Sequence, residues 1–288
     1  MNTFNLPSPL EQLHSPFLKE YGVELWLKRD DLIHPEVSGN KWRKLMHNVK
    51  AAQRTGLTTL LTFGGAFSNH IAATAAAGKL LSLNTIGVIR GDEGFENDTL
   101  IRAKENGMQL HFISREKYKQ KTTPSFIDDL QEQFRNFYLI PEGGANENGV
   151  KGTEEILKEI DQTFDFIAVS AGTGTTASGL CRSLKNQELI VFPALKGGGF
   201  ILEEMSNYCA PEQLKKVQLQ LDYHFGGYGK TKPTQTDFMQ SFYSEHNVEL
   251  DKVYTSKMMF GLFDLIEKKH FKKGTRILAI HTGGLQGK

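Results

Sequence analysis

The sequence predicts an α/β protein with two open, twisted and mostly parallel sheets flanked by helices. Apolar, β-branched segments alternate with helical segments along the chain, and this alternation is typical of right-handed βαβ units in a parallel sheet. Glycine-rich breaks also follow the expected strands, as they do where the carboxyl ends of parallel strands border a ligand crevice. These breaks are Gly64-Gly65, Gly143-Gly144, Gly172 with Gly174, Gly197-Gly198-Gly199, and Gly283-Gly284.

The first series of alternating elements extends to residue 140. Its expected strands are apolar runs that end in charged or glycine-rich turns, and its expected helices are rich in alanine or alternate apolar with charged residues. We expect strands at 24–31, 57–63, 85–89, 109–113 and 137–140, and helices from about 40, at 71–81, 97–106 and 125–134.

A second series begins near residue 152. We expect a helix at 152–160, a strand at 166–170, a helix that follows the loop 171–176, and strands at 189–192, 217–221 and 276–280. Two series of this kind, without a low-complexity linker, predict two domains.

Composition excludes several classes of function. The formal net charge of the 288 residues is +1, so no overall field favours nucleic acid or an acidic membrane. No apolar run approaches about 20 residues, and polar residues interrupt any secretory leader. The two cysteines, Cys181 and Cys209, are too few for a disulfide scaffold, so we expect a reducing cytoplasm. The spacings of histidine and cysteine predict no metal site.

Two lysines at a helix start are the first candidate site. Lys41 and Lys44 follow a Ser-Gly-Asn turn and fall on one helix face. Cations are disfavoured at a helix N-terminus, where the macrodipole favours an anion. A phosphate beside them would explain both, and an amine beside a phosphate suggests a Schiff-base lysine. The alternative is a solvated basic helix start.

The loop at residues 171–176 is the second candidate site. A strand followed by small residues and a helix start provides converging N–H groups for a phosphate, and Thr173, Thr175 and Thr176 add hydroxyls. The spacing Gly172-x-Gly174-x-x-Ala177 also fits a dinucleotide fingerprint. No acidic residue ends the next strand to bind a ribose, which disfavours NAD. Lys196 at that strand end keeps a phosphorylated dinucleotide as an alternative ligand. A glycine-rich turn that binds no ligand is the other alternative.

Several motifs in order resemble the 1-aminocyclopropane-1-carboxylate deaminase and D-cysteine desulfhydrase family, whose members are pyridoxal-phosphate enzymes related to tryptophan synthase β (fold type II). The resemblance covers nearly the whole chain. The motifs are Ser38-Gly39-Asn40-Lys41-x-Arg43-Lys44-Leu45, Gly64 to His70, Pro141-Glu142-Gly143-Gly144, the 171–176 loop, Val253-Tyr254-Thr255-Ser256-Lys257 and His281-Thr282-Gly283-Gly284. The resemblance implies a large domain of residues 1–45 and 152–288 and a small inserted domain of residues 46–151.

The resemblance also assigns roles. Lys41 would carry pyridoxal 5'-phosphate and act as the base, and Lys44 would contact the phosphate. The phosphate would be held by Gly172, Thr173, Gly174, Thr175 and Thr176. Asn69 and Thr255 would contact the cofactor ring, Ser68 the substrate carboxylate, and Tyr228 and Tyr254 would be active-site tyrosines, with Asn69 and His70 also on the substrate side. Independently of the resemblance, His281 follows the last strand and could line the crevice, but we expect a structural histidine.

Two positions favour one reaction within the family. Thr255 and His70 are of the desulfhydrase type, whereas the deaminases carry glutamate and glutamine there. We therefore expect α,β-elimination, with D-cysteine converted to pyruvate, sulfide and ammonia, by a homodimer acting on a small amino acid. The alternatives are ring opening of 1-aminocyclopropane-1-carboxylate and a catalytically idle homologue that binds the cofactor or an amino acid. The chain ends four residues after Gly284, sooner than typical members, so we expect a different substrate wall.

Overall fold

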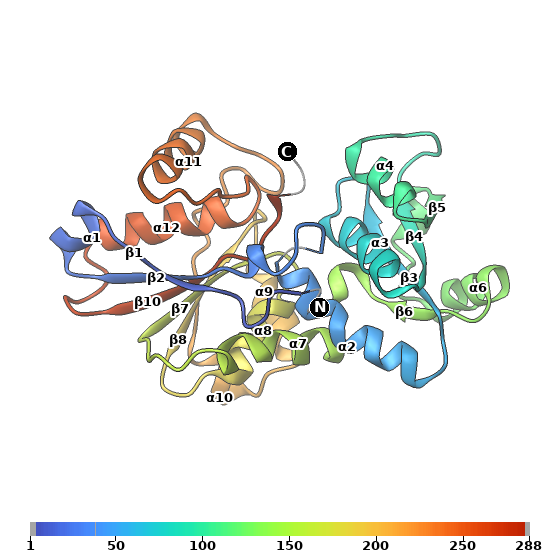
Figure 1. Cartoon of the computed structure of the whole chain (residues 1–288), viewed down its shortest axis with the longest axis horizontal. Helices are drawn as coiled ribbons and strands as arrows, with labels where there is room; N and C mark the ends of the chain where they lie inside the picture. The colour runs from blue at the N-terminus through green and yellow to red at the C-terminus, as the bar shows by residue number, and fades with distance from the viewer. Residues whose placement is uncertain (1–3, 38, 286–288) are drawn as a thin grey trace. The chain divides into compact units, whose positions relative to one another are not determined.

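The computed structural model describes residues 4–37 and 39–285. Ser38, which opens the expected Ser-Gly-Asn turn, lies outside the described residues. The chain forms two compact units, one of residues 4–40 and 150–285 and one of residues 41–149 (Figure 1). Helix α2 (Asn40–Arg54) begins in the first unit and continues in the second. The predicted boundaries at 45/46 and 151/152 stay a prediction.

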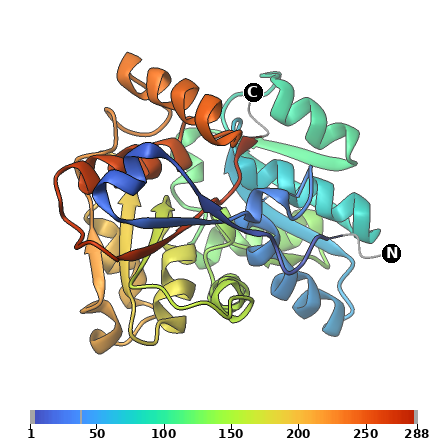
Figure 2. The same ribbon diagram turned by 60° about the vertical axis from the view of Figure 1, so that its left-hand side comes forward.

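The first unit is built on a six-stranded sheet in the order β1-β2-β10-β7-β8-β9. Its strands are β1 (Leu10–Leu13), β2 (Glu24–Lys28), β7 (Phe166–Ala171), β8 (Glu188–Pro193), β9 (Val217–Leu219) and β10 (Arg276–Ile280). All neighbours pair in parallel except β1, which is antiparallel to β2 at the edge (Figure 2). The parallel sheet was predicted, whereas the antiparallel edge strand was not.

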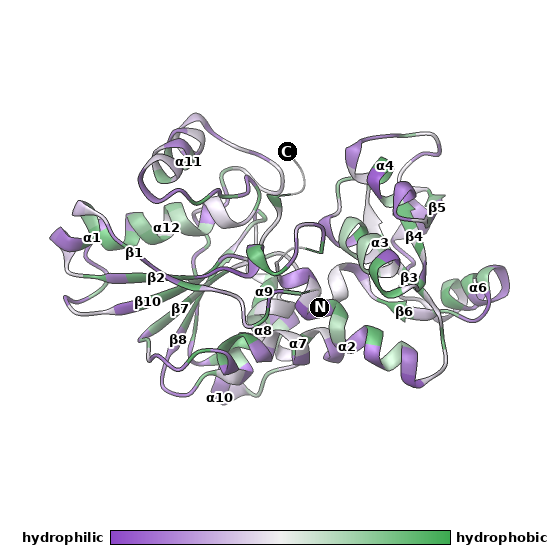
Figure 3. Ribbon diagram, in the orientation of Figure 1, coloured by the Kyte–Doolittle hydropathy of each residue, from purple (hydrophilic) through white to green (hydrophobic). Residues whose placement is uncertain are grey.

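Helices cover both faces of this sheet because its strands carry apolar side chains on both sides. In β10, Ile277 and Ala279 enter one core, which also contains residues of α12, and Leu278 and Ile280 enter the other, against α8 and α9. Figure 3 shows the central strands as hydrophobic. The helices are α1 (Pro16–Tyr21), η1 (Asp30–Leu32), α7 (Glu147–Lys158), α8 (Thr175–Ser183), α9 (Phe200–Ser206), α10 (Pro211–Leu214), α11 (Pro233–His246) and α12 (Thr255–Glu267).

The second unit contains a four-stranded parallel sheet in the order β5-β4-β3-β6. Its strands are β3 (Thr59–Gly65), β4 (Asn84–Arg90), β5 (Met108–Ile113) and β6 (Tyr138–Ile140). Besides α2, its helices are α3 (Asn69–Leu81), α4 (Asp98–Glu105), α5 (Arg115–Tyr118), α6 (Pro124–Phe134) and η2 (Glu142–Gly144). Two cores flank the sheet, one with Phe63 and Val88 and one with Ile71 and Ile89.

Helix α7 begins earlier than its sequence suggests. We expected a start at Gly152, after two glycines, but the helix starts at Glu147. The Asn146 carboxamide oxygen accepts the N–H of Gly149 at 2.9 Å, so an asparagine cap stabilises a first turn that Gly149 weakens. Within the described residues, no helix is long and apolar enough to cross a membrane.

Candidate active-site residues

The loop between β7 and α8 in the first unit has the features of a phosphate site. Gly174 has φ +76° and turns the chain into α8. Thr175 and Thr176 in the first helical turn are buried, and the hydroxyls of Thr173 and Thr175 share a hydrogen bond of 2.9 Å. The Asn40 carboxamide donates to Thr176 Oγ1 at 2.8 Å, so the Thr176 hydroxyl hydrogen remains available as a donor. Free N–H groups at the α8 start and these hydroxyls together suit an anion.

Asn40 ties this loop to the lysine motif through the chain itself. Its amide donates to Thr282 O at 3.2 Å, while its side chain contacts Thr176. Lys41 is the next residue in the sequence. The sequence motif included Asn40 but assigned it no role, because the bond to Thr176 spans 136 residues.

Tyr254 lies directly above the same loop. A Cβ added at Gly172 would come within 3.1 Å of the Tyr254 hydroxyl oxygen, so the tyrosine would have to shift slightly for any larger residue. The ring of Tyr228 packs edge-on against that of Tyr254, with 6.1 Å between centroids, and Tyr228 is 52% exposed. The structure therefore brings Gly172, Tyr228 and Tyr254 together in the first unit.

Thr255 is fully buried at the start of α12 and is bonded to Asp251. Its hydroxyl donates to Asp251 Oδ2 at 2.6 Å and accepts the Asp251 amide at 2.8 Å. The same carboxylate accepts the amides of Val253, Tyr254 and Thr255, at 2.8, 2.7 and 2.7 Å. Because the Thr255 hydrogen is committed to a carboxylate, Oγ1 offers a further partner only a lone pair. Asp251 was not predicted, although an aspartate just before a helix is a capping signal.

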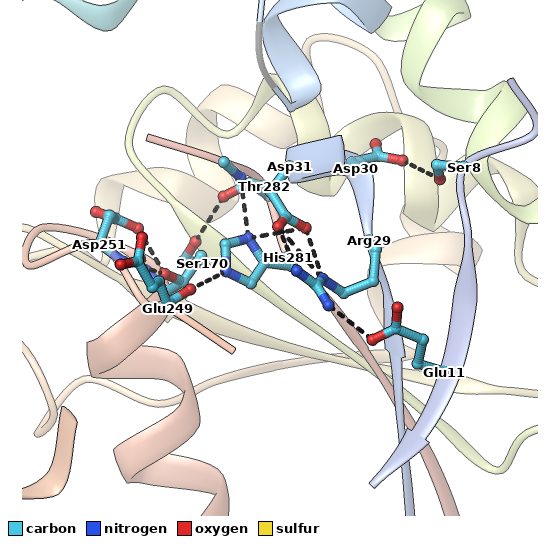
Figure 4. Close-up of polar contacts among 12 residues, drawn as sticks. Ser8, Glu11, Arg29, Asp30, Asp31, Ser170, Glu249, Asp251, His281 and Thr282 are labelled. Carbon is cyan, nitrogen blue, oxygen red and sulfur yellow. Dashed lines mark hydrogen bonds and ion pairs between the residues drawn. The ribbon is translucent and has the colours of Figure 1, made fainter. Parts of the chain in front are cut away.

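His281 is a structural residue, as predicted. Its Nε2 donates to Glu249 O at 2.7 Å and its Nδ1 accepts the Gly283 amide at 3.3 Å, with Asp31 Oδ1 3.4 Å from Nδ1 (Figure 4). The Arg29 guanidinium forms ion pairs with Asp31 at 2.8 Å and with Glu11 at 2.7 Å. Buried polar groups that satisfy one another in this way hold β2, β10 and their loops.

The second unit holds the lysine pair on α2. Lys44 is 5% exposed, and burial, followed by the nearby charge of Lys41, lowers the pKa of Lys44 well below its usual range. A Cβ at Gly144 would lie 3.0 Å from Lys44 Cβ and 3.5 Å from His70 Cε1. The Pro141–Gly144 motif therefore packs directly on Lys44 and His70.

Ser68, Asn69 and His70 form the N-terminus of α3. Ser68 is the N-cap, and its Oγ accepts the amide of Ile71 at 3.4 Å. A Cβ at Gly64 would lie 2.8 Å from Ser68 Oγ, so the glycine after β3 allows the serine to take this place. A helix N-terminus with a serine cap is suited to a carboxylate.

The hydrogen bonds around His70 determine its tautomer. Thr62 donates its hydroxyl hydrogen to Ile140 O at 2.8 Å and must therefore accept from His70 Nε2 at 2.9 Å. Nε2 carries the proton, and Nδ1 is an unprotonated acceptor that has no hydrogen-bond partner among the described residues. Burial, with added repulsion from Lys41 and Lys44, lowers the pKa of His70 to about 3. His70 Nδ1 can therefore accept a hydrogen bond from a ligand.

Comparison with known proteins decides the family. The pattern of the family described as "Pyridoxal-phosphate dependent enzyme" matches residues 2–283. The chain belongs to this family. Its cofactor is pyridoxal 5'-phosphate, which excludes the dinucleotide alternative, and its fold is that of fold-type II enzymes of the family.

Relatives of the pyridoxal-phosphate enzyme bear both expected names. A protein of Pyrococcus horikoshii named putative 1-aminocyclopropane-1-carboxylate deaminase is 33% identical, with 93% of this chain and 87% of that protein covered. A D-cysteine desulfhydrase of Salmonella newport is 32% identical, with 96% and 92% covered. A crystal structure described as an ACC deaminase homologue superposes with a TM-score of 0.83 and 29% identity, covering 99% of this chain and 91% of that one.

The residues present fit the cofactor of this pyridoxal-phosphate enzyme. In the first unit, the 172–176 loop offers hydroxyl and amide donors to a phosphate, and Gly172 lacks the Cβ that would press on Tyr254. In the second unit, His70 Nδ1 is an acceptor with no hydrogen-bond partner among the described residues. No cluster of three metal-binding side chains occurs in the part of the chain that the structure describes. The individual roles of the site residues stay predictions.

Proposed function

We propose that this pyridoxal-phosphate enzyme eliminates the β-substituent of a small D-amino acid, with D-cysteine as the best substrate, and releases pyruvate, sulfide and ammonia. The names of the relatives and the composition of the site support elimination with deamination. Ring opening of 1-aminocyclopropane-1-carboxylate is the second candidate, because relatives of equal similarity bear that name.

The residues would divide the work as follows. Thr173, Thr175 and Thr176 would hold the phosphate of the cofactor, and Lys41 would bond its carbonyl carbon. The cofactor, when bound, withdraws electrons from the substrate α-carbon. Once the substrate amine has replaced it on the cofactor, Lys41 Nζ would take the α-proton. Ser68 and the first amides of α3 would bind the substrate carboxylate.

Thr255 is the observation that carries the choice of substrate. It presents a neutral oxygen, held by Asp251, where the resemblance places glutamate in the deaminases. A neutral group does less than a carboxylate to increase electron withdrawal by the cofactor. Thiolate leaves readily from a β-carbon, so its elimination tolerates weak withdrawal, whereas a cyclopropane has no leaving group. Thr255 therefore favours D-cysteine.

The test measures keto-acid release from D-cysteine, L-cysteine, β-chloro-D-alanine and the cyclopropane acid. We expect kcat/KM for D-cysteine to exceed that for the cyclopropane acid, and Thr255→Glu to narrow the ratio. Thr236→Glu, on the exposed face of α11, is the control and should leave the ratio unchanged. A wild-type preference for the cyclopropane acid would contradict the proposal, and keto acid from no amino acid would support the idle homologue.

We further propose that the enzyme is cytoplasmic and homodimeric. Cys181 and Cys209 are both free thiols, and their mutual hydrogen bond raises the pKa of Cys181, so the pair is suited to a reducing compartment. Light scattering of the purified protein tests the dimer.

A further inference from the structure

The Lys257 ammonium is buried, and the acceptors of its hydrogen bonds are backbone carbonyls rather than a carboxylate. Lys257 lies on α12 and is 1% exposed. Its Nζ donates to three backbone carbonyls, those of Ala194, His224 and Gly227, at 3.2, 2.9 and 2.8 Å. An ammonium has three hydrogens, so these bonds use all its donors. Buried lysines are rare unless paired, and this one is paired only with neutral oxygens.

Converging carbonyl oxygens are how proteins bind a bare monovalent cation. They replace the hydration shell of the ion with backbone dipoles, as the ammonium's ligands do here. Burial opposes the charge and lowers the pKa of Lys257 to about 8, while Asp251 attracts it from beyond bonding distance. The arrangement is thus a cation site whose ion is covalently part of the chain.

The three carbonyls belong to two segments, which also meet through the rings of Phe192 and Tyr223. Ala194 directly follows β8, and the other two lie in the irregular segment 222–229, which we name the carbonyl loop. Phe225, Gly226 and Gly227 all have positive φ, at 52°, 99° and 118°. Phe225 is the non-glycine residue of the three, and its conformation needs outside contacts to persist. The bonds from Lys257 to the neighbouring carbonyls and the packing of the Phe225 ring against Phe260 provide such contacts.

The carbonyl loop also carries Tyr228. Gly227 O accepts from Lys257, and Tyr228 is the next residue, with its ring against Tyr254 above Gly172. Tyr254 immediately precedes α12, three residues before Lys257. The ammonium therefore connects the backbone that carries one tyrosine to the helix that follows the other.

We propose that Lys257 is a positioning residue that acts as a built-in monovalent cation: it holds the carbonyl loop and so places Tyr228 for catalysis. The link from the loop to catalysis rests on the proposed function, which assigns Tyr228 to the active site. The link from the ammonium to the loop rests on the described contacts alone.

The test uses Lys257→Ala, which empties the cage of carbonyls, and Lys257→Met, which fills it with an uncharged side chain. In cofactor-free protein, ammonium or potassium chloride should raise the Tm of Lys257→Ala relative to tetramethylammonium chloride at equal ionic strength, because only the small ions fit. Wild type, Lys257→Met and the exposed-site control Lys272→Ala should show no such difference.

Activity and hydrogen exchange complete the experiment on the full chain. In the loaded enzyme, Lys257→Ala should lose about a hundredfold in kcat/KM, as misplaced groups do, and recover with ammonium. Amides of residues 224–229 should exchange faster in Lys257→Met than in wild type, while those of β8 keep their protection. This measurement does not need the alanine variant to fold. Unchanged exchange, or no small-ion effect on Tm, would overturn the cation role. A small-ion effect on Tm without any loss of activity would overturn the positioning of Tyr228. That result would not bear on the proposed function, which the keto-acid assay with the four substrates tests separately.

Discussion

Single side chains in this enzyme have their chemistry set by partners that are distant in sequence. His70 is neutral because Thr62 and Ile140 orient it and because burial beside Lys41 and Lys44 opposes a proton. Thr255 is an acceptor because Asp251 takes its hydrogen. In both cases the residue type permits several protonation or hydrogen-bonding states, and a second residue selects one.

The pKa of His70 predicts a pH dependence of stability. Between pH 6.5 and about 3, the unfolded chain binds a proton at His70 that the folded protein does not, so stability should fall as the pH falls, by up to about 1.4 kcal/mol per pH unit. We expect His70→Gln to lose that share of the slope. Urea unfolding of cofactor-free protein at pH 7, 6 and 5 measures it. The exposed His270→Gln should retain the wild-type slope, and equal slopes in wild type and His70→Gln would show that His70 is protonated as easily when folded.

At the scale of elements, glycines let loops and helix starts approach one another. Gly39 has φ +66°, and a Cβ there would lie 1.9 Å from Thr282 O, so the entry to α2 fits against the end of β10 only without a side chain. The same approach places Asn40 within hydrogen-bonding distance of Thr282 O and of Thr176 Oγ1.

Gly39→Ala should therefore destabilise the protein much more than a glycine change in open space. Gly56 is the matched control, with φ +72° and no atom within 4 Å of an added Cβ. We expect Gly56→Ala to cost about 1–2 kcal/mol from backbone strain alone. Gly39→Ala should cost a further ~1–3 kcal/mol from overpacking, or prevent folding. Denaturant unfolding gives both values, and equal costs would mean that the Thr282 backbone moves away freely.

The start of α8 should likewise control cofactor retention. Thr176→Val removes the hydroxyl that Asn40 contacts and a donor toward the phosphate, and a charge-assisted hydrogen bond is worth ~1.5–3 kcal/mol. The variant should release the cofactor at least about tenfold more readily in equilibrium dialysis. Thr236→Val on exposed α11 should behave as wild type; if Thr176→Val does too, the phosphate is bound elsewhere.

At the scale of the molecule, each unit has its own sheet, mostly parallel in the first and parallel in the second, and its own pair of cores. A ligand that binds only the folded chain adds to the free energy of unfolding by mass action. The cofactor is such a group in this enzyme.

Cofactor at about 100 times its dissociation constant should add about 2.7 kcal/mol and raise Tm by several degrees. Lys41→Ala should lose most of this gain and the yellow colour, whereas Lys50→Ala, on an exposed site of the same helix, should keep both. Borohydride reduction of wild type should leave the cofactor on the peptide that contains Lys41. Attachment to another lysine would displace Lys41 from its role.

The sequence by itself determined the fold class and the family of this protein. Strand periodicity, glycines after strands and ordered motifs are local signals, so both parallel sheets, the loop 172–176 and the lysine pair could be predicted from them. The antiparallel strand β1 and the early start of α7 could not, because pairing with β2 and capping by Asn146 override weak local preference.

Only the tertiary structure decided the states of the functional groups. Asp251, Thr62, Asn40 and Lys257 act through burial and through contacts that reach from 4 to 136 residues along the chain, and a charge or a proton is set by such surroundings rather than by residue type.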